Sequence, residues 1–271
     1  MWSPFFVCLA FTTALVPRAP MWQSMAVSGG LALMGFAFSY LFFTRGMGFA
    51  SFRGSIARLR PVIAPMSFVI GAVVAVSLAF HWSGLQAVAV VVPVLCFGYM
   101  LALGPSRSGT IVRRAVSSIG RLSDELVIVV GATVLGAAIA ALPMVQRLGA
   151  EVTPAMVSGP MLLGALVVGL VAVGQLGLHP MISVSLAVPV AAAGDFGVCA
   201  VALVCATAFA WGLNATVSIW ALPVAVAAGT FEVPPARMPS RRTLAFLLAY
   251  GAAGILYLSA ANVLLRWLGC A

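Results

Sequence analysis

The sequence contains no lysine and very little charge of either sign. Only 5 of its 271 residues are acidic and 14 are basic, whereas 63% are hydrophobic, and the mean hydropathy is +1.17. Soluble domains carry roughly 25% charged residues, because a polar surface keeps them in solution. A charged fraction of 7% therefore excludes a soluble fold and indicates an integral membrane protein.

Long polar segments and alternating patterns are missing as well. No polar stretch is long enough to form a folded domain outside the membrane. The apolar runs are continuous, whereas strands of a membrane β-barrel alternate polar and apolar residues. We therefore predict an all-α polytopic membrane protein with about eight to nine transmembrane helices and a re-entrant or broken helix. A single transmembrane domain over 1–271 is expected, with spans near 3–16, 22–43, 61–80, 84–103, 125–145, 158–178 and 243–265.

The usual signatures of an intramembrane enzyme are also absent. The sequence has no HExxH metal pair, no GxSxG nucleophile elbow and no aspartate-rich diphosphate motif. Five cysteines lie in or beside apolar runs without paired metal spacing. We therefore predict no catalytic residues, no metal site, no cofactor and no enzymatic activity. The dispersed arginines argue against a nucleic-acid partner, since they form no compact basic domain.

The arginines predict the orientation of the chain in the membrane. Eleven of the fourteen fall in three clusters, within 45–60, 107–121 and 237–242. Cytoplasmic loops of membrane proteins are enriched in basic residues, so we place these clusters and the N-terminus in the cytoplasm, in a plasma (inner) membrane. The short first run could be a signal-peptide core or a retained helix. A retained helix is favoured, because no positive residue precedes the run and no convincing cleavage site follows it.

The region 179–230 is rich in residues that interrupt helices. Its breakers are His179-Pro180, Pro189, the segment 194–197, Gly212 with Asn214, and Pro223. The crossing count requires an even number of spans here, yet three apolar runs are present. Either 181–193 or 215–230 is therefore expected to be re-entrant or broken. Such breaks can be simple kinks, or they can line a substrate or ion site.

Polar residues beside these breaks are the candidate binding residues. Hydroxyl and amide groups could bind an anion or a cation, or could instead form hydrogen bonds between helices. An aspartate and a histidine nearby could titrate, although Asp195 also fits an ordinary turn, and His179 also fits a helix cap or a position at the level of the lipid headgroups. The candidates are Ser183, Ser185, Asn214, Thr216 and Ser218, with His179 and Asp195.

Two segments resemble each other and suggest an inverted repeat. Residues 80–93 and 178–189 each contain an apolar residue, a histidine, a break, an apolar stretch and a proline. Three predicted crossings separate the copies, so their orientations would be opposite. Many secondary transporters are built from such inverted repeats.

Three motifs resemble the C-terminal portion of ion-transporter-superfamily permeases, which include dicarboxylate, citrate and arsenite-type carriers. They are DELVIVVGATVLGAAI at 124–139, GLHPMISVSLAVP at 177–189 and WGLNATVSIWALP at 211–223. The resemblance covers roughly 120–265 and implies a site on a broken helix with a Ser-Asn-Thr-type motif. The comparable residues are Asn214, Ala215 and Thr216, with Leu213 where serine is expected. The chain is shorter than the usual member, so one repeat could be incomplete or supplied by another subunit.

We therefore expect a secondary transporter that moves a small anionic solute or organic acid with a coupling cation, a proton or sodium. Its partners would be the lipid bilayer, the solute and that cation, and a homo-oligomer is left open. The alternative is a non-transport membrane protein, such as an accessory or assembly subunit.

Overall fold

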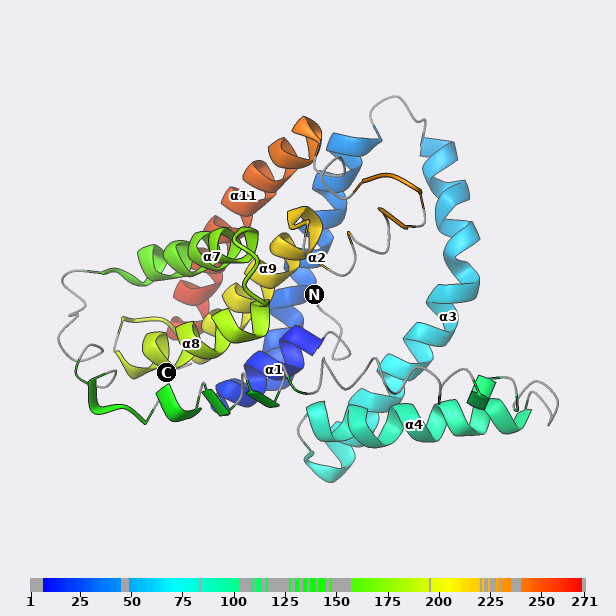
Figure 1. Cartoon of the computed structure of the whole chain (residues 1–271), viewed down its shortest axis with the longest axis horizontal. Helices are drawn as coiled ribbons and strands as arrows, with labels where there is room; N and C mark the ends of the chain where they lie inside the picture. Colours follow the sequence, from blue (N-terminus) through cyan, green and yellow to red (C-terminus); the bar gives the residue numbers. More distant parts are fainter. Residues whose placement is uncertain are drawn as a thin grey trace. The chain divides into compact units, whose positions relative to one another are not determined.

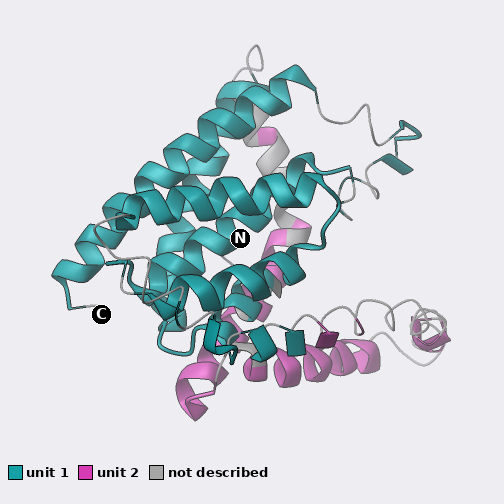
Figure 2. Cartoon of the chain, turned by 60° about the vertical axis from the view of Figure 1, so that its left-hand side comes forward, with its two compact units in different colours: residues 1–45, 132–271 teal, residues 46–131 magenta. Residues whose placement is uncertain are grey.

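The structure is a computed structural model. It describes residues 7–44, 49–82, 84–102, 157–194, 196–219 and 240–269, with isolated positions and short stretches between 109 and 147 and between 221 and 234. The regular secondary structure of these residues is entirely α-helical. The chain divides into two compact units, which Figure 2 shows in different colours. Unit 1 comprises 1–45 and 132–271, and unit 2 comprises 46–131.

Unit 1 is a bundle organised around one buried helix, α9 (Ala200–Val217). Five helices contact α9, so it lies at the centre of the bundle (Figure 1). A helix that is apolar on all sides is stable only when it is surrounded, and 78% of the apolar window of α9 is buried. The surrounding helices are α1 (Val7–Leu15), α2 (Met21–Phe43), α7 (Gly159–Gln175), α8 (Pro180–Ala193) and α11 (Arg241–Trp267).

Small residues allow close packing around α9. A Cβ atom on Gly254 of α11 would lie 2.1 Å from Cζ of Phe209, so only glycine fits there. Two tyrosines of α11 bind α2, because the hydroxyls of Tyr250 and Tyr257 donate to the carbonyls of Leu31 and Val27 at 2.7 and 3.2 Å. Close approach and interhelical hydrogen bonds are the interactions that associate helices inside a membrane.

The first helix packs into unit 1. Cys8, Leu9 and Thr12 of α1 are buried, and the ring of Phe11 meets that of Trp211 edge-on at 6.4 Å. Helix α1 also contacts α8.

Unit 2 contains two contacting helices, α3 (Phe49–Phe80) and α4 (Gly84–Ala102). The chain turns between them at His81, whose φ is +53°. Each helix continues through proline, at Pro61 and Pro65 in α3 and at Pro93 in α4. Helix α3 begins at Phe49, well before the predicted start of the third span near 61, and so includes most of the interval that holds the first arginine cluster. Arg53 therefore lies in a helix and not in a loop.

The observed helices agree in part with the predicted spans. Helices α2, α3, α9 and α11 contain segments that are long and apolar enough to cross a membrane. Nine of the 21 residues of the predicted span at 125–145 lie outside the described residues. The count of eight to nine spans, the single domain and the inverted repeat therefore stay predictions. The two repeat segments share one local feature, since His81 and His179 each precede a helix with an internal proline.

Large apolar side chains cover the outside of the helices. Leu33 and Phe36 on α2 are 72% and 67% exposed, and Leu248 and Leu256 on α11 are each 72% exposed. Such dense apolar exposure is unfavourable in water and favourable against lipid chains. Together with helices of spanning length, it identifies a membrane-integral protein.

Candidate functional site

The candidate site is built around a sharp turn between α7 and α8. Helix α7 stops because Gly177 adopts a left-handed conformation with φ of +90°, in which its N–H bonds the carbonyl of Gly174 at 3.3 Å. Glycine is favoured there because it lacks a Cβ atom. Pro180 then starts α8 at a position where the missing N–H of proline costs nothing. The Gly-Leu-His-Pro sequence thus predicts a helix end followed by a helix start.

His179 caps the first turn of α8. Its Nδ1 accepts a hydrogen bond from the backbone N–H of Met181 at 3.3 Å. Its ring meets that of Trp211 on α9 edge-on, with the centroids 6.3 Å apart. The helix cap considered from the sequence is therefore observed, and His179 also contacts the central helix.

Asn214 and Ser218 join the ends of α7 and α9. The Oδ1 of Asn214 accepts from Nε2 of Gln175 at 3.0 Å, and the Oγ of Ser218 donates to the carbonyl of Gly174 at 3.1 Å. Asn214 is 4% exposed and Ser218 is 1% exposed. Residues four apart share one face of a helix, so both side chains point at the same turn of α7.

The backbones approach very closely at this contact. A Cβ atom on Gly174 would lie 2.2 Å from Nδ2 and 2.5 Å from Oδ1 of Asn214. The amide of Asn214 therefore occupies the space that any other residue at 174 would fill. The position of the Asn214 amide therefore requires glycine at residue 174.

The two serines of α8 lie on different sides of their helix. Both are buried, and neither Oγ has a hydrogen-bond partner among the described residues. Ser183 lines a groove between α7 and α8, whereas Ser185 does not. Residues two apart do not share a helix face, so these hydroxyls cannot converge on one ligand.

The remaining two candidates are Thr216, which does not join the cluster, and Asp195. Thr216 is exposed, and its Oγ1 donates to the carbonyl of Leu213 on its own helix at 2.7 Å. Asp195 lies outside the described residues.

The predicted pattern of helix breaks is corrected in two places. Helix α8 is continuous through Pro189, and α9 continues through Gly212 and Asn214 to Val217. The burial of α9 on all sides outweighs the roughly 1 kcal/mol that an interior glycine costs. The interruptions observed between these helices lie at 176–179 and at 194 and 196–199, beside the predicted breakers His179-Pro180 and 194–197, and α9 ends at Ser218.

Two members of the cluster were not identified from the sequence. Gln175 forms the amide pair with Asn214, and Trp211 contacts His179. A usable signal for Gln175 existed, because it is an isolated amide in an apolar run directly before a Gly-Leu-His-Pro turn. No spacing in the sequence predicts a role for Trp211, because its contact with His179 depends on how α8 packs against α9.

The electrostatics of the site come from helix ends and neutral polar groups. The C-terminal ends of α7 and α9 carry partial negative charge, and the N-terminal end of α8 carries partial positive charge. The hydrogen bonds Gly174–Ser218 and Gln175–Asn214 bring the two negative ends together, and the α7–α8 turn adds the positive end beside them. Such a group of ends can attract an anion at one point and a cation at another. Among the described residues, no three His, Cys, Asp or Glu side chains gather as metal ligands.

Comparisons with known proteins give no match. No protein-family model, no curated protein and no solved structure matches this chain. The resemblance to ion-transporter permeases therefore stays a prediction.

Proposed function

We propose that the chain is a secondary transporter for a small anion or organic acid, coupled to protons or sodium. The site is the turn between α7 and α8 together with the end of α9. Asn214, Ser218 and Gln175 supply neutral hydrogen-bonding groups, and His179 supplies a titratable one. The observation that carries the proposal is the meeting of an amide pair, of which Asn214 is buried and Gln175 is exposed, with helix ends of opposite partial charge.

The helix ends and amide groups of this proposed site can bind the solute and the cation in turn. Helix N-termini favour anionic groups of a substrate, whereas backbone carbonyls at helix C-termini favour a cation. An amide can both donate and accept, so Asn214 and Gln175 can exchange their mutual hydrogen bond for bonds to a solute. Ser185 and Thr216 lie on other helix faces and are not part of this proposed solute site.

The test is solute uptake into proteoliposomes with an imposed proton or sodium gradient. We expect gradient-driven uptake of at least one member of a panel of radiolabelled mono-, di- and tricarboxylates and oxyanions. Asn214→Ala should lower that uptake at least tenfold, because the amide contacts the solute. Ser259→Ala is the matched control, since its Oγ donates only to Ile255 of its own helix and lies on α11. Size-exclusion elution identifies variants that fail to fold.

The alternative is an accessory or assembly subunit without transport activity. One observation favours it, because Asn214 and Ser218 already have helix–helix hydrogen-bond partners, as packing residues would. A folded wild-type protein that moves no solute under either gradient would contradict transport. Equal uptake by wild type and a folded Asn214→Ala variant would instead contradict this site.

A further inference from the structure

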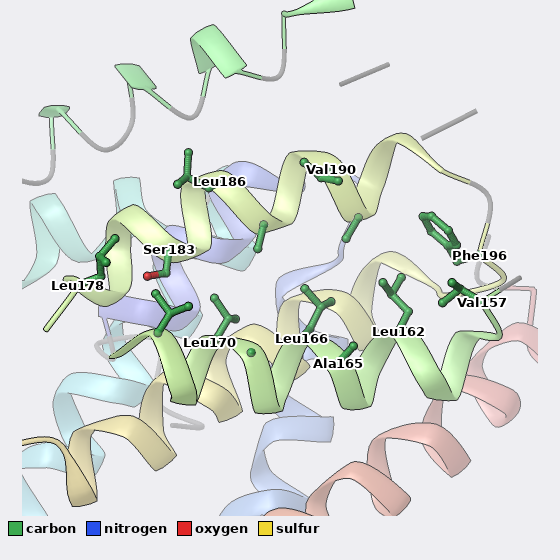
Figure 3. A pocket seen from close by; sticks show the side chains of 14 residues that line it. Val157, Leu162, Ala165, Leu166, Leu170, Leu178, Ser183, Leu186, Val190 and Phe196 are labelled. Atoms are coloured by element: carbon green, nitrogen blue, oxygen red, sulfur yellow. The ribbon is translucent and has the colours of Figure 1, made fainter. Parts of the chain in front are cut away.

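A long groove runs between α7 and α8, and neither residue of the amide pair lines it. Figure 3 shows its lining side chains, which come from both helices and from the segments beside them. Its volume is about 590 Å³, within the roughly 300–1,000 Å³ range of ligand cavities. All of its lining residues belong to unit 1.

Small residues on facing sides of the two helices create the space. Ala165 and Gly169 lie four apart on α7, and Ala187 and Ala191 lie four apart on α8. Such stripes usually let two helices pack in direct contact. Here the helices remain apart, and a Cβ atom on Gly169 would meet no atom within 4 Å.

The groove has one polar group, and it lies near one end. Ser183 is 6% exposed, and its Oγ has no hydrogen-bond partner among the described residues. Figure 3 shows its oxygen between the two helices, close to Leu178. The opposite end is apolar and is formed by Val157, Val190 and Phe196. A buried hydroxyl without a partner is costly, so a group that accepts its proton is expected there.

This asymmetry matches an amphiphile with one oxygen-bearing end and an apolar tail. The polar end also lies beside the N-terminus of α8, whose partial positive charge favours an oxygen atom. Helix α8 has 14 residues and is therefore about 21 Å long. One leaflet of the hydrocarbon core is about 15 Å thick, so a lipid tail fits along the groove.

We infer that the groove binds one acyl chain of a membrane phospholipid, whose ester carbonyl accepts a hydrogen bond from Ser183. This lipid site is distinct from the proposed solute site and does not depend on transport. The turn at 176–179 would lie at the depth of the lipid esters, and the tail would extend toward Phe196. The lipid would then fill the space that the small residues leave between α7 and α8.

The first test uses a phospholipid with a photoactivatable diazirine in its acyl chain. The full chain is reconstituted in vesicles of this lipid and phosphatidylcholine, and labelled peptides are quantified against those of α11. We expect labelling concentrated in 162–191. Gly169→Leu should lower it at least fivefold by filling the groove. Ala172→Leu is the control, because Ala172 is exposed on the same helix but does not line the groove.

Ser183→Ala keeps the shape of the groove and removes its hydroxyl. We expect about a two- to tenfold loss of labelling, the factor that one hydrogen bond provides. Labelling that is equal in wild type, Ser183→Ala and Gly169→Leu would overturn the proposal. So would labelling that is as strong on α2 and α11 as on α7 and α8.

A photoreactive amino acid in place of Leu186 identifies the occupant directly. An adduct with the mass of a phospholipid supports the proposal. An adduct with a free fatty acid, a second copy of the chain, or the chain's own residues 125–145 would overturn it.

Discussion

At the scale of single residues, the contact between Gly174 and Asn214 links helix packing to the proposed chemistry. The asparagine amide fills the position of a side chain at 174, and its Oδ1 accepts from Gln175. Ser218 adds a second bond to the carbonyl of Gly174. The same glycine therefore permits the buried side chains of Asn214 and Ser218 to meet the exposed amide of Gln175 at the end of α7.

Gly174→Ala tests this contact. The added Cβ atom would overlap Asn214, so the amide pair must shift and part of its hydrogen bonding is lost. Overpacking of this kind costs about 1–3 kcal/mol, and we expect that loss in the free energy of unfolding measured in mixed detergent micelles. The amide lies in the proposed site, so solute uptake should fall as well.

Gly169→Ala is the matched control for that variant. It lies on the same helix, and its Cβ atom would meet nothing within 4 Å. Replacing glycine by alanine in a helix interior stabilises by up to about 1 kcal/mol. If both alanine variants change stability by the same amount, the close approach at Gly174 is contradicted.

At the scale of elements, the start of α9 is fixed by one side chain of α11. Oδ1 of Asn262 accepts from the N–H of Cys199 at 2.8 Å, and its Nδ2 donates to the carbonyl of Gly197 at 2.9 Å. Gly197 has φ of +65°, so the chain reverses there before α9 begins. Asn262 thus satisfies backbone groups that the turn leaves unpaired.

Asn262→Ala should therefore destabilise the bundle. The buried N–H of Cys199 and the part-buried carbonyl of Gly197 would lose their partner, at a cost of about 1–3 kcal/mol in the free energy of unfolding. Ser259→Ala, one turn earlier on α11, removes only a bond within its own helix and should change stability by less than about 0.5 kcal/mol. Both are measured by unfolding in mixed detergent micelles. A smaller effect for Asn262→Ala than for Ser259→Ala would refute this role.

The elements also show how far the sequence predicts this fold. Apolar runs located α2, α4, α7 and α11 to within a few residues, because length and hydropathy alone determine such helices. The continuity of α8 and α9 was not predictable, because it depends on neighbours that are distant in sequence. The turn at Gly177 followed a local rule, whereas the pairing of Asn214 with Gln175 depends on how α7 lies against α9.

At the scale of the whole molecule, the directions of the helices bear on the membrane topology. In unit 1, the hydrogen bonds from Asn214 and Ser218 join the ends of α7 and α9, and Asn262 places the end of α11 beside the start of α9. Helix α8 runs in the opposite direction to α7 and α9, because one turn precedes it and another follows it. These alternating directions are those that two crossings between α7 and α11 would require, and the even number of crossings expected for 179–236 stays a prediction. They also place the turns at Leu178 and Gly197 at opposite ends of unit 1.

The arginine count then assigns a side to each end. Eleven of fourteen arginines are predicted to be cytoplasmic, which places Leu178 and Ser240 inside and Asp195 and Leu268 outside. In a background without native cysteines, single cysteines at 195 and 268 should react with a membrane-impermeant maleimide on intact cells. Single cysteines at 178 and 240 should react only after permeabilisation. Positions 178 and 240 form one pair and positions 195 and 268 form the other, and the members of a pair are predicted to lie on the same side. Reversed reactivity at all four positions would contradict the positive-inside assignment alone. Different reactivity within a pair would contradict the helix directions themselves.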